Sequence, residues 1–376
     1  MKKQKDKEKE IKNKTASDFG QGKVLFVNHN LTGGGSERVM ALLASYYADH
    51  GVDTEMALIT DAERTYPVSE KLKITECFCQ PTKNKIIWHI RRLLSLRKAI
   101  KKSGADTVIS FMWDINMHVV LACAGLHKKV IISERADPQN VGKRRKTLEF
   151  AMKWIFPHAD MTVFQTPDAQ MTYPEKVRRK STVIPNPVVL KNNGEENGSA
   201  TEREKTVIAA GRFTEQKNFA MLIRAFAIFG KDHPEYTLTI YGEGALRDMQ
   251  EKLISELGLD GRVSMPGFVS DLGERMKTAG IYASSSDFEG ISNSMLEALA
   301  AGVPSVCTDC PVGGAAMAID DHVSGILVKP GDADGMARAL AQIADDEDFA
   351  RSLSVNAVKK SREFLIDKVA EKWMSL

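Results

Sequence analysis

Short apolar runs alternate with helical patterns twice along this chain, once on each side of a proline-rich interruption. In the first half, the runs suited to buried strands are residues 24–27, 56–59, 107–111, 130–133 and 161–165. In the second half, they are residues 207–210, 237–241, 262–265, 281–283 and 305–307. Strands that alternate with helices form a parallel sheet with helices on both faces. The pattern therefore predicts two α/β domains, which suits a chain of 376 residues.

The interruption between the two series marks a domain junction. Pro185-Asn186-Pro187 predicts a stiff, extended turn, and residues 191–205, rich in Asn, Gly and Glu, predict a surface loop. We therefore expect an N-terminal domain at residues 21–186 and a C-terminal domain at residues 187–360. The last residues, 361–376, have a helical pattern, and we expect this helix to pack back on the N-terminal domain.

Basic residues are concentrated in three segments. Residues 1–14 hold seven lysines and three acids with almost no apolar residue, which predicts a disordered tail over residues 1–20. From Lys83 to Lys102 there are eight Lys or Arg and no acid, interleaved with isoleucine, leucine and tryptophan. This is a basic amphipathic helix, which suits an anionic lipid surface, although a solvated helix can have the same pattern. A third basic cluster, residues 143–146, precedes an apolar segment around Trp154.

The composition limits which cellular compartment and which class of partner the protein can have. No apolar run approaches the roughly 20 residues of a membrane-spanning helix, and no signal-peptide pattern follows Met1. The five cysteines suit a reduced compartment, and Cys307-x-x-Cys310 lacks the second pair or nearby histidine of a zinc site. We expect a cytoplasmic protein, peripheral on the inner face of the cell membrane if helix 83–102 binds lipid. With a net charge of only +3, we expect no nucleic-acid partner.

Two carboxylates in the second half form the most informative local pattern. Glu289 lies in a polar loop, and Glu297 lies eight residues later, about one turn into a helix that Ser292 or Asn293 can cap. A loop, a helix N-terminus and two acids suit a ligand that has both phosphates and hydroxyls.

Further candidates follow other predicted strands. Arg212 and Lys217 come after the strand at 207–210, where two cations suit a diphosphate, although surface cations near a turn explain the spacing equally well. Gly242 and the pair Phe268-Val269 lie in later strand-end loops, which could approach a nucleobase or be plain turns.

Gly33-Gly34-Gly35 opens the first helix, and its N–H groups attract anions or sugar hydroxyls. The spacing is not G-x-G-x-x-G, so a nicotinamide enzyme is disfavoured.

Taken in order, these motifs resemble a family 4 glycosyltransferase. The glycine loop, the Pro-Asn-Pro junction, Gly211-Arg212 with Lys217-Asn218, and the pair Glu289/Glu297 match over roughly residues 23–365. The loops look most like those of bacterial enzymes of capsule, exopolysaccharide or O-antigen synthesis. The resemblance implies the GT-B fold, two Rossmann-like domains facing across a cleft. It also implies retaining transfer of a hexose from a nucleotide sugar, a UDP-sugar above all, to a lipid-linked or polysaccharide acceptor.

The resemblance also implies residue roles on the donor side. Arg212 and Lys217 would hold the donor diphosphate, Glu289 would contact the sugar, and Glu297 would bind the ribose. The remaining implied donor-side residues are Gly34, Gly35, Gly242, Phe268, Val269, Gly290, Ile291, Ser292, Asn293 and Ser294. No cofactor and no metal is expected, because Arg and Lys would neutralise the diphosphate.

The acceptor side departs from the family pattern. Many relatives place a histidine where this chain has Ser133-Glu134-Arg135, so Glu134 or Arg135 is expected to act there. His118 is a further candidate, although a lone histidine on an apolar helix is more often packed core. Met317 stands where many relatives have a glutamate and receives no donor role. Two alternatives stay open, a GT-B UDP-sugar epimerase and a non-catalytic nucleotide-sugar-binding protein.

Overall fold

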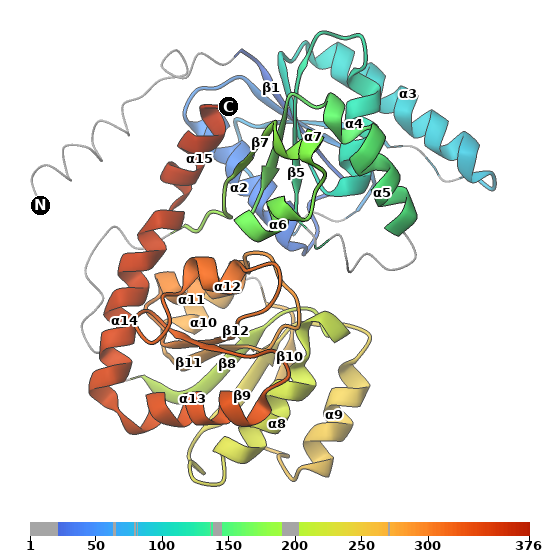
Figure 1. Cartoon of the computed structure of the whole chain (residues 1–376). Coiled ribbons are helices and arrows are strands. Elements are labelled where there is room, and N and C mark those ends of the chain that lie inside the picture. Colours follow the sequence, from blue (N-terminus) through green and yellow to red (C-terminus); the bar gives the residue numbers. More distant parts are fainter. Residues whose placement is uncertain are drawn as a thin grey trace, which may run out of the picture. The chain divides into compact units, whose positions relative to one another are not determined.

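A computed structural model describes residues 22–62, 65–78, 80, 82–135, 137, 145–189, 203–269 and 271–376. The predicted tail, half of the cluster 143–146 and most of the predicted loop 191–205 lie outside the described residues. The chain divides into two compact units (Figure 1). Unit 1 comprises the residues up to Pro187 together with Ile366–Leu376, and unit 2 comprises Val188–Leu365.

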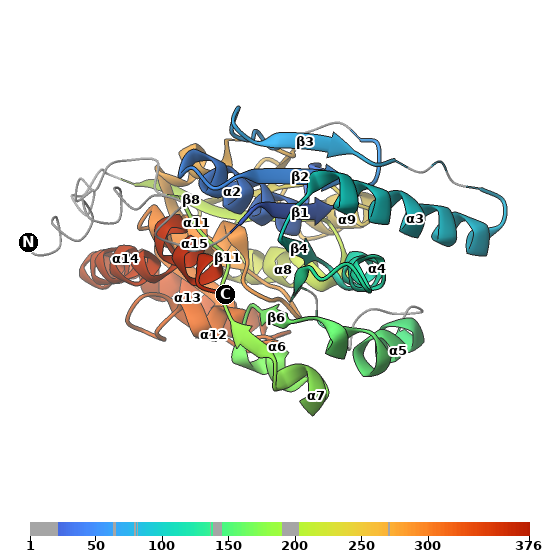
Figure 2. The ribbon, with the colours of Figure 1, turned by 90° about the horizontal axis from the view of Figure 1, so that it is seen from above.

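Unit 1 is built on a seven-stranded parallel sheet. Its strands, in spatial order, are β3 (Lys73–Glu76), β2 (Thr54–Leu58), β1 (Val24–Asn28), β4 (Thr107–Phe111), β5 (Lys129–Glu134), β6 (Met161–Phe164) and β7 (Ser181–Val183). The chain runs outward from β1 to β3, then returns to β4 on the other side of β1; Figure 2 shows β3, β2, β1 and β4 side by side. The strand order therefore reverses between β1 and β4, and ligands of open α/β sheets bind at such a switch point.

The helices of unit 1 pack against this sheet or against one another. They are α2 (Gly35–Asp49), α3 (Lys85–Ser103), α4 (Trp113–Cys123), α5 (Arg145–Trp154), the 3-10 turn η4 (Phe156–His158), α6 (Pro167–Met171), α7 (Glu175–Arg178) and α15 (Ile366–Met374). Phe26 of β1, Tyr47 of α2 and Trp373 of α15 are fully buried in one core. The prediction that the last helix packs on the first domain is confirmed.

Unit 2 repeats the architecture with a six-stranded parallel sheet. Its strands, in spatial order, are β10 (Val263–Gly267), β9 (Thr237–Tyr241), β8 (Glu204–Ala210), β11 (Ala279–Ser284), β12 (Ser305–Thr308) and β13 (Ile326–Val328). Here the switch point lies between β8 and β11, so the loops that follow these two strands are where a ligand site is expected.

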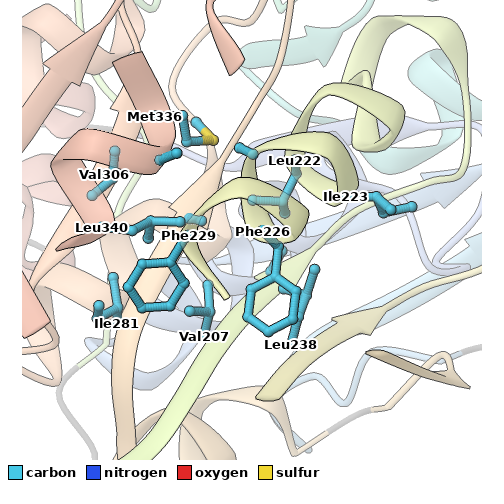
Figure 3. Close-up of a cluster of buried hydrophobic side chains, with 14 of the residues drawn as sticks. Val207, Leu222, Ile223, Phe226, Phe229, Leu238, Ile281, Val306, Met336 and Leu340 are labelled. Atoms are coloured by element: carbon cyan, nitrogen blue, oxygen red, sulfur yellow. The ribbon is translucent and has the colours of Figure 1, made fainter. Parts of the chain in front are cut away.

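The helices of unit 2 enclose a second core. They are the 3-10 turn η5 (Glu215–Lys217), α8 (Phe219–Phe229), α9 (Arg247–Glu256), α10 (Leu272–Met276), α11 (Asn293–Ala300), α12 (Gly314–Ala318), α13 (Ala333–Asp345), α14 (Glu347–Ser361) and the 3-10 turn η6 (Arg362–Phe364). Figure 3 shows Phe226 and Phe229 of α8 packed with Leu340 of α13 over Val207 of β8. Each such side chain contributes about 1.5–3 kcal/mol by leaving water.

All ten predicted strands are present, and three further strands among the described residues were not predicted. The three, β3, β7 and β13, all lie at sheet edges. No residue of β3 or β7 is fully buried. An edge strand needs no continuous apolar run, so its sequence does not stand out. The basic helix predicted at 83–102 is α3, capped by the Asn84 side chain, which accepts the N–H groups of Ile86 and Ile87.

Candidate active site

The loops after β8 and β11 are joined by hydrogen bonds at the switch point of unit 2. The Asn218 amide donates to Asp287 Oδ1 at 2.9 Å, and the Asp287 N–H donates to the Gln216 carbonyl at 2.9 Å. Ser285 Oγ donates to the Lys217 carbonyl at 2.9 Å. Asn218 also caps α8 from a left-handed backbone conformation, φ 41°, which asparagine tolerates better than most residues. These hydrogen bonds thus hold the loop after β8 against the loop after β11.

Lys217 and Glu289 form an ion pair inside this loop pair. Lys217 Nζ lies 2.5 Å from Glu289 Oε2, and the two side chains are 15% and 22% exposed. Gln216 Nε2 and Ser286 Oγ lie 3.5 Å from the same oxygen. A charge-assisted pair at this degree of burial fixes both groups. The structure therefore brings together a cation and an acid that the sequence placed 72 residues apart.

Arg212 is exposed in the same loop as Lys217. The Lys217 side chain packs against Gly211, where a Cβ atom would lie 2.9 Å from Lys217 Cε. Within the described ranges, the Arg212 guanidinium makes no ion pair. The loop after β8 therefore presents one paired and one unpaired cation, so an anion can bind there without first breaking an Arg212 contact.

A loop absent from the site predictions holds the Glu289 backbone. The Glu289 N–H donates to the Pro311 carbonyl at 2.6 Å, and the Val312 N–H donates to the Glu289 carbonyl at 3.1 Å. Gly314 lies so close to Gly290 that a Cβ atom on it would be 1.8 Å from the Gly290 carbonyl oxygen. In the sequence, the two consecutive glycines at 313 and 314 could have indicated that this loop approaches another segment closely. They allow the loop to set the position of the catalytic candidate Glu289.

The N-terminus of α11 adds backbone donors and two hydroxyls. Ser292, rather than Asn293, is the N-cap, and its hydroxyl accepts the Met295 N–H. Ser294 Oγ lies 3.0 Å from Ser292 Oγ and 2.9 Å from Tyr282 Oη. Burial raises the pKa of Tyr282 well above its ordinary value, so its phenol stays a hydrogen-bond donor.

Two predicted residues near this helix start are enclosed. The Ile291 side chain is 3% exposed and packs in the core, so only its backbone can meet a ligand. Glu297 lies on α11 and is 8% exposed. The two predicted carboxylates thus lie in different settings: Glu289 is partly open in a loop, and Glu297 is enclosed on a helix.

Gly242 and Phe268 follow the neighbouring strands β9 and β10. Gly242 has φ 142°, and a Cβ atom there would lie 1.9 Å from the Gly211 carbonyl oxygen. Close packing on the β8 loop therefore requires a glycine at 242. The Phe268 ring is 52% exposed, and Val269 beside it is half-buried, so this loop offers an aromatic surface to a ligand.

Gly34 and Gly35 belong to unit 1, whereas the other donor candidates belong to unit 2. Gly34 is the N-cap of α2, and a Cβ atom on it would lie 2.0 Å from Glu37 Oε2. Ser36 Oγ donates to the same oxygen at 2.8 Å. An acid of the chain itself therefore lies at the helix N-terminus where an anion or a sugar hydroxyl was expected.

The acceptor-side candidate Glu134 lies at the end of β5, with its side chain in the core. It accepts hydrogen bonds from Asn116 Nδ2 at 2.6 Å and from Tyr173 Oη at 3.0 Å. Burial raises the pKa of Glu134 to about 8, more than these hydrogen bonds lower it. The carboxyl is therefore mostly protonated at neutral pH, and its contacts are those of a core network.

Arg135 leaves the same strand end in another direction. Its Cζ lies 4.2 Å from the ring centroid of Phe111 and 5.8 Å from that of Trp373, and its guanidinium donates to Asn186 Oδ1. These contacts fasten α15 and the Pro-Asn-Pro segment to the sheet. The third candidate, His118, is 4% exposed on α4, where its ring meets Asp114 and His89.

Neither the cysteine pair nor any other group of potential metal ligands forms a further site in the described part of the chain. Burial raises the pKa of Cys310 to about 11 and that of Cys307 further, so both thiols stay protonated at neutral pH. Across the residues that the structure describes, no group of three or more His, Cys, Asp or Glu is arranged to hold a metal ion. Among the same residues, none of the helices has the length and apolar character needed to span a bilayer.

Two family profiles match the chain, one for each part. The profile described as Glycosyltransferase Family 4 matches residues 33–192, and that described as Glycosyl transferases group 1 matches residues 192–360. The chain belongs to the family 4 glycosyltransferases. The predicted family, the two-domain parallel-sheet fold and general glycosyltransferase activity are thereby confirmed.

Curated relatives match this glycosyltransferase along its length. A Campylobacter jejuni GalNAc-α-(1→4)-GalNAc-α-(1→3)-diNAcBac-PP-undecaprenol α-1,4-N-acetyl-D-galactosaminyltransferase is 28% identical over 361 residues, covering 94% of this chain and 98% of its own. A second C. jejuni enzyme, N-acetylgalactosamine-N,N'-diacetylbacillosaminyl-diphospho-undecaprenol 4-α-N-acetylgalactosaminyltransferase, is 27% identical over 358 residues, covering 91% and 94%.

Solved structures share the fold of this glycosyltransferase at low sequence identity. Anabaena Alr3699/HepE in complex with UDP and glucose has a TM-score of 0.77 and 18% identity, covering 93% of this chain and 97% of its own. Sucrose-phosphate synthase (tll1590) from Thermosynechococcus elongatus has a TM-score of 0.80 and 18% identity, covering 94% and 97%.

Proposed function

We propose that this glycosyltransferase is a retaining enzyme that moves a hexose, N-acetylhexosamine included, from a UDP-sugar to a lipid-linked or polysaccharide glycan acceptor in cell-surface polysaccharide synthesis. The observation that supports it most is the Lys217–Glu289 ion pair, with Arg212 exposed in the same loop as Lys217. These groups lie at the switch point of unit 2, next to the N-terminus of α11. This arrangement supplies cations for a diphosphate and a carboxylate for a sugar.

The chemistry of transfer explains why both signs of charge are needed. As the bond between the anomeric carbon and the phosphate oxygen breaks, negative charge grows on the diphosphate and positive charge on the sugar ring. Arg212 and Lys217 stabilise the leaving diphosphate, and Glu289 stabilises the sugar. Lys217 exchanges part of its contact with Glu289 for the phosphate when the donor binds. Glu297 binds the ribose, and Phe268 with Val269 contacts the base.

The names of the relatives support the acceptor class and the stereochemistry. Both C. jejuni enzymes are named for undecaprenol-linked acceptors and for α linkages. An α linkage is the product that retention gives from an α-linked UDP-sugar. We therefore propose an undecaprenyl-diphosphate-linked glycan as the first acceptor to test.

Donor binding is proposed to need no metal ion, because two cations of the loop after β8 neutralise the diphosphate. Transfer is expected to continue in excess EDTA, at a rate within about twofold of the untreated enzyme. Arg212→Ala with Lys217→Ala should abolish binding of UDP with or without Mg²⁺. Loss of transfer in EDTA, restored by added Mg²⁺, would contradict this part of the proposal.

The helix α3 supports a peripheral location on the inner face of the cell membrane. Its first half exposes apolar side chains that a solvated helix would bury: Ile86 is 71% exposed, Ile90 52% and Leu94 59%. Lysines and arginines share the helix, so apolar burial and attraction to anionic lipid act together. The second half turns inward, with Leu96 and Ile100 fully buried.

Vesicle flotation tests this location. At low salt the protein should float with vesicles of phosphatidylglycerol and phosphatidylethanolamine, and not with phosphatidylcholine alone. Replacing Ile86, Ile90 and Leu94 by serine should abolish flotation. The matched control Met249→Ser, a 68% exposed apolar residue of unit 2, should leave it unchanged. Absence of the wild-type protein from the floating fraction would remove the membrane proposal.

The central test measures donor binding and transfer in sequence. UDP-sugars should raise the unfolding temperature more than GDP-sugars, because a ligand that binds only the folded state stabilises it. The best donor is then incubated with undecaprenyl-diphosphate-linked glycans, and the anomer of the product is read by NMR. A new epimer of the donor without acceptor would identify an epimerase instead. Donor binding with neither transfer nor epimerisation would identify a binding protein.

A further inference from the structure

Unit 1 has its own cluster of charged side chains at its switch point. His29 directly follows β1, and Asp114 lies at the second position of α4, just after β4. The two strands are neighbours in the sheet, with Val24 paired to Thr107, so their carboxyl ends lie together. Arg92, from α3, completes the cluster. Three segments far apart in the sequence thus converge where open α/β sheets bind ligands.

The hydrogen bonds of His29 fix its tautomer. Arg92 Nη2 lies 3.1 Å from His29 Nδ1, and an arginine can only donate, so Nδ1 accepts. The proton of the neutral ring is then on Nε2, which lies 2.7 Å from Asp114 Oδ2 and donates to it. Both ring nitrogens are used. His29 therefore orients the Asp114 carboxylate and has no nitrogen left to act as a base.

A second histidine fixes the backbone of Asp114. His118 Nδ1 lies 2.6 Å from the Asp114 carbonyl, to which it must donate, and His118 Nε2 lies 3.2 Å from His89 Nδ1. Burial lowers the pKa of His118, and the charges of Arg92 and His89 lower it further, against the hydrogen bond to Asp114. The ring is therefore neutral at neutral pH and accepts from His89. Its contacts also explain why the helix position 118 needs a histidine.

The Asp114 carboxylate is ionised, fixed and partly open. Burial alone would raise the pKa of Asp114, but the hydrogen bonds from His29 and from the Ile115 N–H, together with the charge of Arg92, outweigh it, so the pKa is lowered. The Asp114 side chain is 24% exposed and that of His29 is 26% exposed, while Arg92 is only 5% exposed. The Asp114 carboxylate is therefore accessible to solvent, whereas the Arg92 guanidinium is not.

These properties select the ligand. An ionised carboxylate only accepts hydrogen bonds, so the ligand must donate, and a free diphosphate would be repelled. The enclosed Arg92 and the histidines disfavour a cation. Trp88 is half-buried, with its ring centroid 5.2 Å from Arg92 Cζ, and adds an apolar surface. A neutral molecule with hydroxyl donors and apolar faces, which is the chemistry of a sugar ring, fits the cluster.

We propose that Asp114 binds a hydroxyl of the glycan acceptor, with His29 and Arg92 as positioning residues that hold its carboxylate. The proposal rests on the proposed function, since it assigns the acceptor to unit 1. A purely structural role would predict that changing Asp114 lowers stability without affecting acceptor affinity. The two accounts therefore differ in one measurable quantity, the KM for the acceptor.

The first experiment uses the full chain, its best UDP-sugar and an undecaprenyl-diphosphate-linked N-acetylgalactosaminyl glycan. Asp114→Asn should raise the acceptor KM at least about tenfold, because a hydrogen bond to a charged carboxylate is lost. UDP should still raise the unfolding temperature, which shows that the donor site is intact. The matched control Asp168→Asn, at an exposed aspartate in the first turn of α6, should change none of these values.

The positioning role of His29 is tested by a matched pair of variants. His29→Gln keeps an N–H that can donate to Asp114, whereas His29→Phe keeps the ring size and removes the donor. The acceptor KM should rise several-fold in His29→Phe and be mostly restored in His29→Gln. Equal acceptor KM values in the two variants would overturn the role of this hydrogen bond.

A second measurement does not depend on transfer. Saturation-transfer NMR with methyl α-N-acetylgalactosaminide should show sugar protons close to the wild-type protein, and Asp114→Asn should weaken this signal by about tenfold. If the wild type transfers sugar but Asp114→Asn leaves the acceptor KM unchanged, the inference fails while the proposed function stands. If the wild type does not transfer, the NMR decides: a signal lost in Asp114→Asn supports the site, and no wild-type signal overturns it.

Discussion

The two units place charged clusters at the same point of the same kind of sheet, but an arginine is exposed in unit 2 and enclosed in unit 1. In unit 2, Glu289 is paired with Lys217 while Arg212 is exposed. In unit 1, Arg92 is enclosed while Asp114 is partly open. Unit 2 therefore offers a cation and suits a diphosphate, whereas unit 1 offers a carboxylate and suits hydroxyls. The fold supplies the position, and a few side chains set the ligand class.

The largest predicted effect on the transfer rate comes from replacing Glu289 of unit 2. Glu289→Ala should lower kcat by at least about 10,000-fold, because a group that acts on the reacting sugar is removed. UDP binding, measured by calorimetry, should be largely kept. Glu243→Ala, at a glutamate of unit 2 that is 56% exposed and paired with Arg247, is the control and should transfer normally. Normal transfer by Glu289→Ala would break the assignment of unit 2 as the chemical site.

A stability effect should be confined to unit 1. Trp373 is fully buried against Phe111, so Trp373→Ala should lower the free energy of unfolding of unit 1 by about 3–5 kcal/mol. Trp154→Ala, at a tryptophan 57% exposed, should change it by less than about 0.5 kcal/mol. Hydrogen exchange should show faster exchange in the strands of unit 1 alone. Equal loss of protection in unit 2 would contradict the independence of the two units.

The buried acid Glu134 should make unit 1 sensitive to pH. Because the folded pKa of Glu134 is raised to about 8, above its unfolded value, its protonated form favours folding at low pH. This contribution is lost as pH rises through about 8, by on the order of 3 kcal/mol from about pH 6 upward. Glu134→Gln keeps a neutral group of the same shape, so its unfolding temperature should fall less with rising pH. Parallel curves for wild type and variant would show that Glu134 does not titrate in this range.

The smallest predicted effects come from two glycines of unit 2. Gly242 is needed for close packing, whereas Gly261 is needed only for its backbone conformation. Gly242→Ala should destabilise unit 2 by about 2 kcal/mol and weaken UDP binding, because the new Cβ would meet the Gly211 carbonyl. Gly261 has φ 78° with open space around it, so Gly261→Ala should cost about 1 kcal/mol and leave UDP binding unchanged. Thermal unfolding and UDP titration measure both. Equal effects on UDP affinity would mean that the contact with Gly211 does not shape the donor site.

The central strands could be predicted from local sequence, and so could the places of the proposed donor residues of unit 2. A strand buried on both faces needs a continuous apolar run, and the proposed donor residues lie in the loops and the helix start that follow such runs. Edge strands such as β3 and β7 have no such run, so they were missed.

The cluster of unit 1 could not be found in the same way. His29, Arg92 and Asp114 lie on three segments, and their contacts depend on how α3 packs beside α4. The spacing of Asp114 and His118, four residues apart on one helix, was the only local signal. Likewise, no local pattern showed that Glu134 and Arg135 turn toward core side chains.

Unit 1 is made of two pieces of chain with all of unit 2 between them, and this affects the order of folding during synthesis. A nascent chain that has just passed Leu365 contains every residue of unit 2 but lacks the helix that supplies Val369 and Trp373 to the core of unit 1. The two ends of unit 2 are already joined at this stage, since the Val188 N–H donates to the Phe364 carbonyl at 2.7 Å. Domains usually fold in the order in which they leave the ribosome. Here the second unit can be finished first, and the first must keep apolar surface uncovered until α15 has been translated.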